Sequence, residues 1–247
     1  MANGDILYHI PLYEELENED IVRAEEMNEF FEEQRTQELA KKPRIVFKYK
    51  TLATKKDIKR ICNMLKSKKI YMPALKQLND PLESANSFLL GSDERARETY
   101  FSNYRILSLS KNPLIPTMWA YYADNYQGLC LGFKTDNNFS NIQEVNYYNE
   151  QDAIIFGDNF GEEDLLKKGT AWKHEEEWRI LQNDLEKEYF EYGDDLICII
   201  FGHKISPKIR KKIEKVIPNG VQIFTVKPDC SKFCLYLENI NGNLEIL

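Results

Sequence analysis

Short apolar segments separated by turn-forming residues recur from residue 45 to residue 237, and this spacing limits the fold more than any other feature. Many of these segments alternate apolar with polar side chains or are rich in Val, Ile, Tyr and Phe, which is typical of β-strands. No internal repeat is visible. The segments expected as strands are 45–50, 70–72, 104–110, 128–133, 142–148, 176–181, 196–201, 221–226 and 232–237.

Fewer segments have helical periodicity. Thr54 is suited to cap a helix in which Ile58 and Ile61 recur on one face. The chain from 44 to 247 is therefore expected to be a single α+β domain, with a mixed, largely antiparallel, many-stranded sheet and flanking helices. The expected helices are 55–67, 92–103, 116–124 and 206–217, with a loop at 78–83 and a loop or weak helix at 150–170.

The negative charge is concentrated at the N-terminus. Residues 1–43 hold 12 acidic and 4 basic side chains, whereas residues 44–247 carry a balance of +1 within a total of −7. A Glu-rich stretch at 13–41 with an imperfect apolar stripe predicts an acidic helical arm. This arm either docks on the body as a structural helix, or it binds a protein partner or covers a site as an autoinhibitory flap.

Composition excludes several classes of protein. Hydrophobic residues make up 43% and charged residues 30%, and no segment has the ~20 apolar residues of a membrane helix. Without a signal peptide, the chain is expected in the cytoplasm. A nearly neutral body argues against duplex-DNA binding but allows a small anionic ligand in a pocket. With Cys230 and Cys234 as the only close cysteine pair and three histidines, no metal site is expected.

The common nucleotide-binding and hydrolase motifs are absent, and four polar clusters remain. In the first, Lys48 and Lys50 share one face of a strand and Tyr49 lies on the other. They either form a cationic pair for phosphate or carboxylate, or lie on a solvated edge strand. In the second, Asn79 and Asp80 belong to a segment, 79–83, that is either an ordinary turn or a loop aiming a carboxylate at a cleft.

The third cluster combines hydroxyl and aromatic side chains. Ser108 and Ser110 share one face at the end of a strand. The following helix carries aromatic side chains that form either core or a wall on which a ligand ring stacks. These side chains are Trp119, Tyr121 and Tyr122, together with Met118.

The fourth cluster, WKHEEEWR at 172–179, is the most informative. If the segment is extended, Glu175 and Glu177 share a face with Cα atoms about 6.6 Å apart. Two carboxylates this close can differ in pKa, which suits acid or electrostatic catalysis. A solvated charge run is the alternative, but tryptophans on both sides indicate packing.

Together, FKYK, IYMPALKQLNDPLE, ILSLSKN, TMWAYYADNYQGLCLGF, VNYY and WKHEEEWRI resemble the bacterial family known as domain of unknown function 2971. The resemblance runs in order from about residue 45 to about residue 202. A second resemblance is to the ADP-ribosyltransferase superfamily. Its arginine–serine–glutamate class has a basic residue on the first strand, then Ser-x-Ser, then Glu-x-Glu. Here lysine replaces the arginine, and it lacks the planar guanidinium fork.

The second resemblance implies an ADP-ribosyltransferase-like fold and NAD as substrate. Glu177 would then stabilise an oxocarbenium-like transition state and Glu175 would orient or deprotonate the acceptor, with Ser108 and Ser110 as positioning residues. The implied NAD-binding residues are Lys48, Tyr49, Lys50, Asn79, Asp80, Trp119, Tyr121, Tyr122, Trp178 and Arg179.

Three functions remain open on the sequence. The first is an NAD-consuming ADP-ribosyltransferase or NAD glycohydrolase, which the family type suggests is a toxin or phage-defence effector. The second is a non-catalytic sensor of a nucleotide or other small anion. The third is a Mg²⁺-dependent nuclease that uses Asp80, Glu83, Glu175 and Glu177. The acceptor macromolecule is not identified by the sequence.

Overall fold

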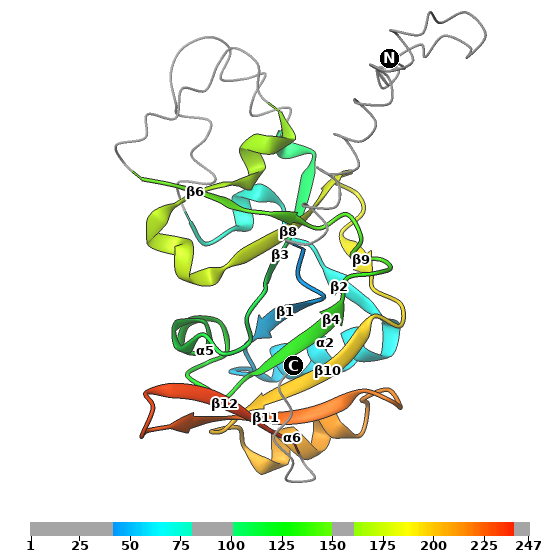
Figure 1. The fold of residues 1–247 in the computed structure, drawn as a ribbon. Coiled ribbons are helices and arrows are strands. Elements are labelled where there is room, and N and C mark those ends of the chain that lie inside the picture. The colour runs from blue at the N-terminus through cyan, green and yellow to red at the C-terminus, as the bar shows by residue number, and fades with distance from the viewer. Residues whose placement is uncertain (1–41, 81–100, 150–160, 240–247) are drawn as a thin grey trace, which may run out of the picture. The chain divides into compact units, whose positions relative to one another are not determined.

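The computed structural model describes residues 42–80, 101–149 and 161–239, which belong almost entirely to a compact unit spanning residues 44–247 (Figure 1). The expected N-terminal arm, most of the expected helix at 92–103, and Glu83 lie outside the described residues. None of the helices in the described ranges is both long and apolar enough to cross a bilayer.

An eight-stranded sheet with the order β12-β11-β10-β4-β1-β3-β8-β5 forms the centre. Only β10 and β11 are parallel among its neighbouring strands. This confirms the predicted α+β class and the mixed, largely antiparallel sheet. The strands are β1 (Ile45–Lys50), β3 (Tyr104–Ser110), β4 (Leu129–Lys134), β5 (Gln143–Glu144), β8 (Glu177–Asn183), β10 (Leu196–Gly202), β11 (Gln222–Asp229) and β12 (Cys234–Asn239).

Two small sheets accompany the large one. β2 (Lys69–Tyr71) pairs with β9 (Tyr189–Glu191), and β6 (Asn146–Tyr148) pairs in parallel with β7 (Lys167–Gly169). The expected strand at 142–148 is therefore wrong as one unit, because β5 and β6 join different sheets. β9 and β7 were not expected from the sequence.

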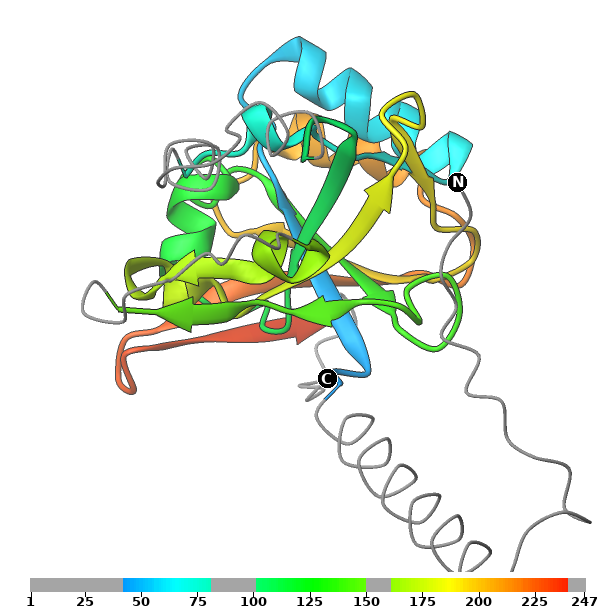
Figure 2. The ribbon, with the colours of Figure 1, turned by 90° about the horizontal axis from the view of Figure 1, so that it is seen from above.

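Within the described residues, the helices are α2 (Lys55–Ser67), α5 (Pro116–Tyr122) and α6 (Pro207–Glu214), and the 3₁₀ helices are η1 (Leu75–Gln77), η3 (Glu162–Leu166) and η4 (Thr170–Glu175). Thr54 caps α2 as predicted: its Oγ1 accepts from the Asp57 amide at 3.1 Å, and Asp57 accepts from the Thr54 amide at 3.0 Å. Figure 2 shows α2 and α6 side by side over one face of the sheet.

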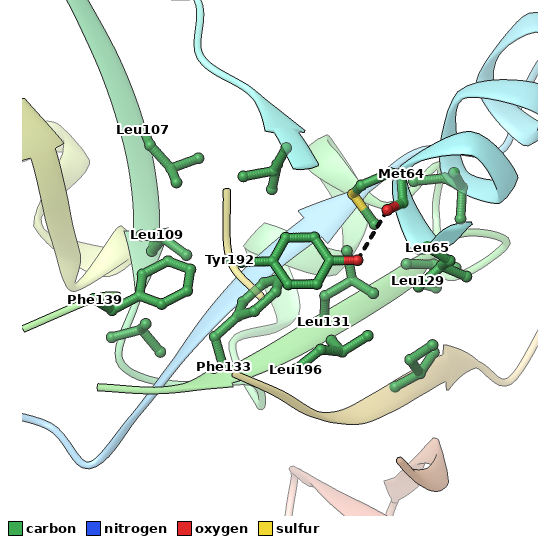
Figure 3. Close-up of a cluster of buried hydrophobic side chains, with 14 of the residues drawn as sticks. Met64, Leu65, Leu107, Leu109, Leu129, Leu131, Phe133, Phe139, Tyr192 and Leu196 are labelled. Carbon is green, nitrogen blue, oxygen red and sulfur yellow. Dashed lines mark hydrogen bonds between the residues drawn. The ribbon is translucent and has the colours of Figure 1, made fainter. Parts of the chain in front are cut away.

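Alternation along the strands divides the core. Val46 packs with α2 and α6 on one face of β1, whereas Phe47 and Tyr49 pack with α5 on the other. The first core also holds Tyr192, whose hydroxyl donates to the Met64 carbonyl at 3.0 Å (Figure 3). Burial of each large apolar side chain contributes roughly 1.5–3 kcal/mol to the stability of the fold. These contacts hold in place the strands that carry the site.

Candidate functional site

The sheet is split between β1 and β3. These strands pair at a single position, Phe47 opposite Ser110, whereas β3 pairs with β8 along its whole length. A cavity of about 290 Å³ lies at this divergence. Its lining comes from all four sequence clusters and includes Lys48, Tyr49, Lys50, Asn79, Asp80, Ser108, Ser110, Met118, Tyr122, Glu175 and Glu177.

The two lysines of β1 enter this cavity from the middle of the sheet, because β1 lies between β4 and β3. The alternative of a solvated edge strand is therefore wrong. The Lys48 Nζ donates to the Ser108 carbonyl at 2.5 Å. This bond joins the two strands where they diverge.

The Lys50 ammonium has no hydrogen bond or ion pair with any part of the chain that the structure describes. Burial lowers the pKa of Lys50 to about 7, and the nearby charges of Lys48 and Arg60 act in the same direction. Burial likewise lowers the pKa of Lys48 to about 8, although Glu177 and Glu175 oppose the shift. An anion at this point would supply the missing counter-charge.

The two carboxylates meet by a route that differs from the expected one. Glu175 ends the 3₁₀ helix η4, Glu176 is left-handed with φ of 46°, and Glu177 begins β8. The expected extended conformation across Glu175–Glu177 is therefore wrong, because the chain turns at Glu176. Both carboxylates are buried and accept from the Lys168 Nζ, at 2.5 Å and 2.8 Å. The alternative of a solvated charge run is contradicted for both.

Glu177 is also held by Arg179, through Nε at 2.8 Å and Nη2 at 3.0 Å. Burial alone would raise the pKa of Glu177, but the adjacent Arg179 and Lys168 outweigh it and hold that pKa well below its ordinary value. Glu175 accepts from the Tyr122 hydroxyl at 2.6 Å. The geometry thus fixes both carboxylates before any ligand arrives.

The two serines lie beside these carboxylates. Ser110 is opposite Glu177 and Ser108 is opposite Arg179 in the β3–β8 ladder. The Ser110 hydroxyl is bonded to the backbone of Asn112 at 3.2 Å. The Ser108 side chain has no hydrogen-bond partner within residues 42–80, 101–149 and 161–239, so it can bind a ligand.

Two of the predicted aromatic contacts are absent from this cavity. Trp119 is fully buried in the core, where its Nε1 donates to the Pro113 carbonyl at 2.8 Å. Trp178 is buried on the face of β8 opposite Glu177 and packs in the core. Both were expected to contact a cofactor, and strand or helix geometry directs them inward instead.

Tyr121 and Arg179 also differ from expectation. Tyr121 is 72% exposed and lines a neighbouring groove rather than the cavity. Arg179 is buried, and its guanidinium donates to Glu177 and, through Nη1 at 2.5 Å, to the Leu165 carbonyl. It therefore orients Glu177 rather than meeting a ligand directly.

Sequence reasoning missed Lys168 and Tyr147. Lys168 is the buried cation between the carboxylates, and its Nζ lies 5.0 Å from the ring centroid of Trp172. The Tyr147 hydroxyl accepts from the Glu177 amide at 2.9 Å. The one available signal was physical: two buried carboxylates require a cation nearby, and Lys168 is among the few candidates close in sequence.

Within the described ranges, no three or more His, Cys, Asp or Glu side chains gather in the manner of metal ligands. The fold and cavity define an α+β protein with a preformed cluster of paired acidic and basic side chains in a split sheet. A family model described as a protein of unknown function (DUF2971) matches residues 118–180, which run from α5 into β8. This match confirms the predicted resemblance to that family over residues 118–180. No curated protein and no solved structure matches.

Proposed function

We propose that the chain binds NAD in the β1–β3 cavity and cleaves the bond between nicotinamide and ribose. The observation that carries this proposal is the convergence of three elements in chain order: the lysine pair of β1, Ser108 and Ser110 of β3, and Glu175 and Glu177. This arrangement supports an ADP-ribosyltransferase-like fold and site.

The reaction breaks the C–N glycosidic bond, and the electron pair leaves with neutral nicotinamide. The remaining ribose cation is captured by water or by an acceptor hydroxyl or amine, which loses a proton to solvent. Glu177 and Glu175 place carboxylate oxygens where the oxocarbenium character develops, and Lys168 and Arg179 hold them in position, so that they stabilise the transition state more than the ground state. Lys48 and Lys50 bind the diphosphate at the other end of the cavity.

A second candidate is a sensor that binds the same anion without chemistry. It is favoured by one observation: Glu177 is already neutralised by Arg179 and Lys168. A carboxylate that is fully paired has less remaining potential to act on a ribose. The toxin or phage-defence role and the metal-dependent nuclease are the remaining proposals.

The test is incubation of the purified protein with NAD and chromatographic measurement of nicotinamide. Wild type and Glu144→Gln, an exposed change on β5, should release nicotinamide equally. Glu175→Gln should slow release at least about 100-fold, the usual cost of losing one electrostatic contact in a transition state. A wild type that binds NAD without cleaving it would favour the sensor, and release unaffected by Glu175→Gln would overturn the assignment of the carboxylates.

A further inference from the structure

A second cavity, of about 530 Å³, lies beyond Lys50 between α2, β2 and β9. Lys50 and Thr51 line both this cavity and the cavity at the β1–β3 split. Tyr71 lines the second cavity and Gln77 the first, and the Tyr71 hydroxyl donates to Gln77 Oε1 at 2.9 Å. The end of β1 is therefore the common border of the two cavities.

The lining of the second cavity suits a flat ring with polar edges. Ile61, Met64 and Ile70 are buried and supply apolar surface. The rings of Tyr71 and Tyr189 lie edge to face, with centroids 5.7 Å apart, and Tyr189 remains 50% exposed. Aromatic rings of this kind stack on nucleobases, and they do so with little dependence on base identity. Asn63 and Ser67 add hydrogen-bonding groups.

The other charged groups that line this cavity have partners, whereas Lys50 has none among the described residues. Lys69 pairs with Glu191, and Glu188 with Arg105 at 3.1 Å. Asp57 caps α2 and lies 3.5 Å from Arg60. An anion that spans the two cavities would bind most favourably beside this ammonium, because it would supply the missing counter-charge.

We infer that the second cavity continues the ligand site and takes the second nucleoside of a dinucleotide, whose diphosphate lies at Lys50. This inference rests on the proposed function and names the class of its substrate: two nucleosides joined by a diphosphate, not a mononucleotide. The ring nearest Glu175 and Glu177 belongs to the half that is cleaved. The other ring lies against Tyr71 and Tyr189.

The test compares the affinities of NAD and nicotinamide mononucleotide by calorimetry. Ser67→Trp fills the second cavity from an exposed position at the end of α2, and Lys66→Trp places the same side chain at the adjacent exposed position outside the lining. Wild type and Lys66→Trp should bind NAD at least about 10-fold more tightly than the mononucleotide. Ser67→Trp should lose that advantage without weakening mononucleotide binding.

A second variant, Tyr189→Ala, removes the exposed ring and should weaken NAD binding roughly 10-fold. The inference is overturned if Ser67→Trp and Tyr189→Ala bind NAD as wild type does, or if wild type does not bind NAD. If wild type releases nicotinamide and neither Ser67→Trp nor Tyr189→Ala changes the affinity for NAD, only the role of the second cavity is rejected. Binding that depends on the second cavity, without nicotinamide release, would reject the proposed cleavage alone.

Discussion

The two ends of the β1–β3 cavity handle charge in opposite ways. At the carboxylate end, Glu175 and Glu177 are held by Lys168, and Glu177 also by Arg179. At the lysine end, Lys50 has no ion pair with any described residue. The difference indicates that the protein's own side chains balance the charge at the carboxylate end, and that a ligand balances the charge at the lysine end. Changes at the carboxylate end should affect both folding and nicotinamide release, and changes at the lysine end should mainly affect binding.

The largest effect is expected from Lys168→Met. It removes a buried cation from between two buried carboxylates, and breaking such a network costs about 3–5 kcal/mol. Urea unfolding measures this loss. Lys227→Met is the matched control, because Lys227 and Glu238 form a cross-strand pair in which both side chains are about 40% exposed. It should cost far less stability than Lys168→Met, because an exposed pair is screened by water. Equal costs would contradict the claim that Lys168 stabilises the carboxylate end of the cavity.

Ligand binding should depend on pH through the lysine end. The pKa of Lys50 is lowered to about 7 and that of Lys48 to about 8, so both are cationic at pH 6 and largely neutral at pH 9. The diphosphate of NAD stays ionised over this interval. Affinity for NAD should therefore fall as pH rises from 6 to 9. Calorimetry at several pH values checks this, and an affinity independent of pH would place the diphosphate elsewhere.

The same lysines should make the ligand-free protein more stable as pH rises. Their pKa values in the folded state lie below the unfolded value near 10.5, so the unfolded chain holds more protons between about pH 7 and 10.5. Lys50 alone should add about 2–3 kcal/mol to the free energy of unfolding between pH 6 and pH 9. Lys50→Met should remove that increment. If the free energy of unfolding rises equally with pH in wild type and Lys50→Met, Lys50 is not desolvated in the folded protein.

The smallest effect is expected from Tyr122→Phe. This change removes the Tyr122 hydroxyl, which donates to Glu175 at 2.6 Å. Because Tyr122 ends the partly exposed helix α5, the loss should cost about 1 kcal/mol of stability. Nicotinamide release should slow several-fold because Glu175 loses one of its two fixing contacts. A loss of activity as large as that of Glu175→Gln would instead give Tyr122 a direct contact with the substrate.

Much of the fold could be predicted because local signals agreed with tertiary structure. Thr54 and the periodic apolar side chains set α2, and alternation placed Lys48 and Lys50 on one face of β1. β9 was missed because three residues between polar turns carry too little pattern. The chain turn at Glu176 was also invisible, because a left-handed glutamate is stabilised by distant partners such as Asn112, whose Nδ2 donates to it at 3.3 Å.

The site was predicted in part for a similar reason. Polar side chains among strands identified Ser108, Ser110 and Glu177 without showing how the strands pair. Trp119 and Trp178 were expected at the ligand because an aromatic side chain beside a polar cluster suits either core or stacking. Only the paired strands and the packed helix decide between those environments, and they direct both indoles into the core.

The most direct test of the central claim is titration of the protein with NAD at pH 6.5, for wild type, Lys50→Met and the exposed control Lys55→Met. Charged hydrogen bonds contribute about 1.5–3 kcal/mol, so Lys50→Met should weaken binding about 10-fold or more. Wild type and Lys55→Met should bind one equivalent with equal affinity. If wild type does not bind NAD, or if Lys50→Met binds it with equal affinity, the claim that an anionic ligand balances the charge at the lysine end is contradicted.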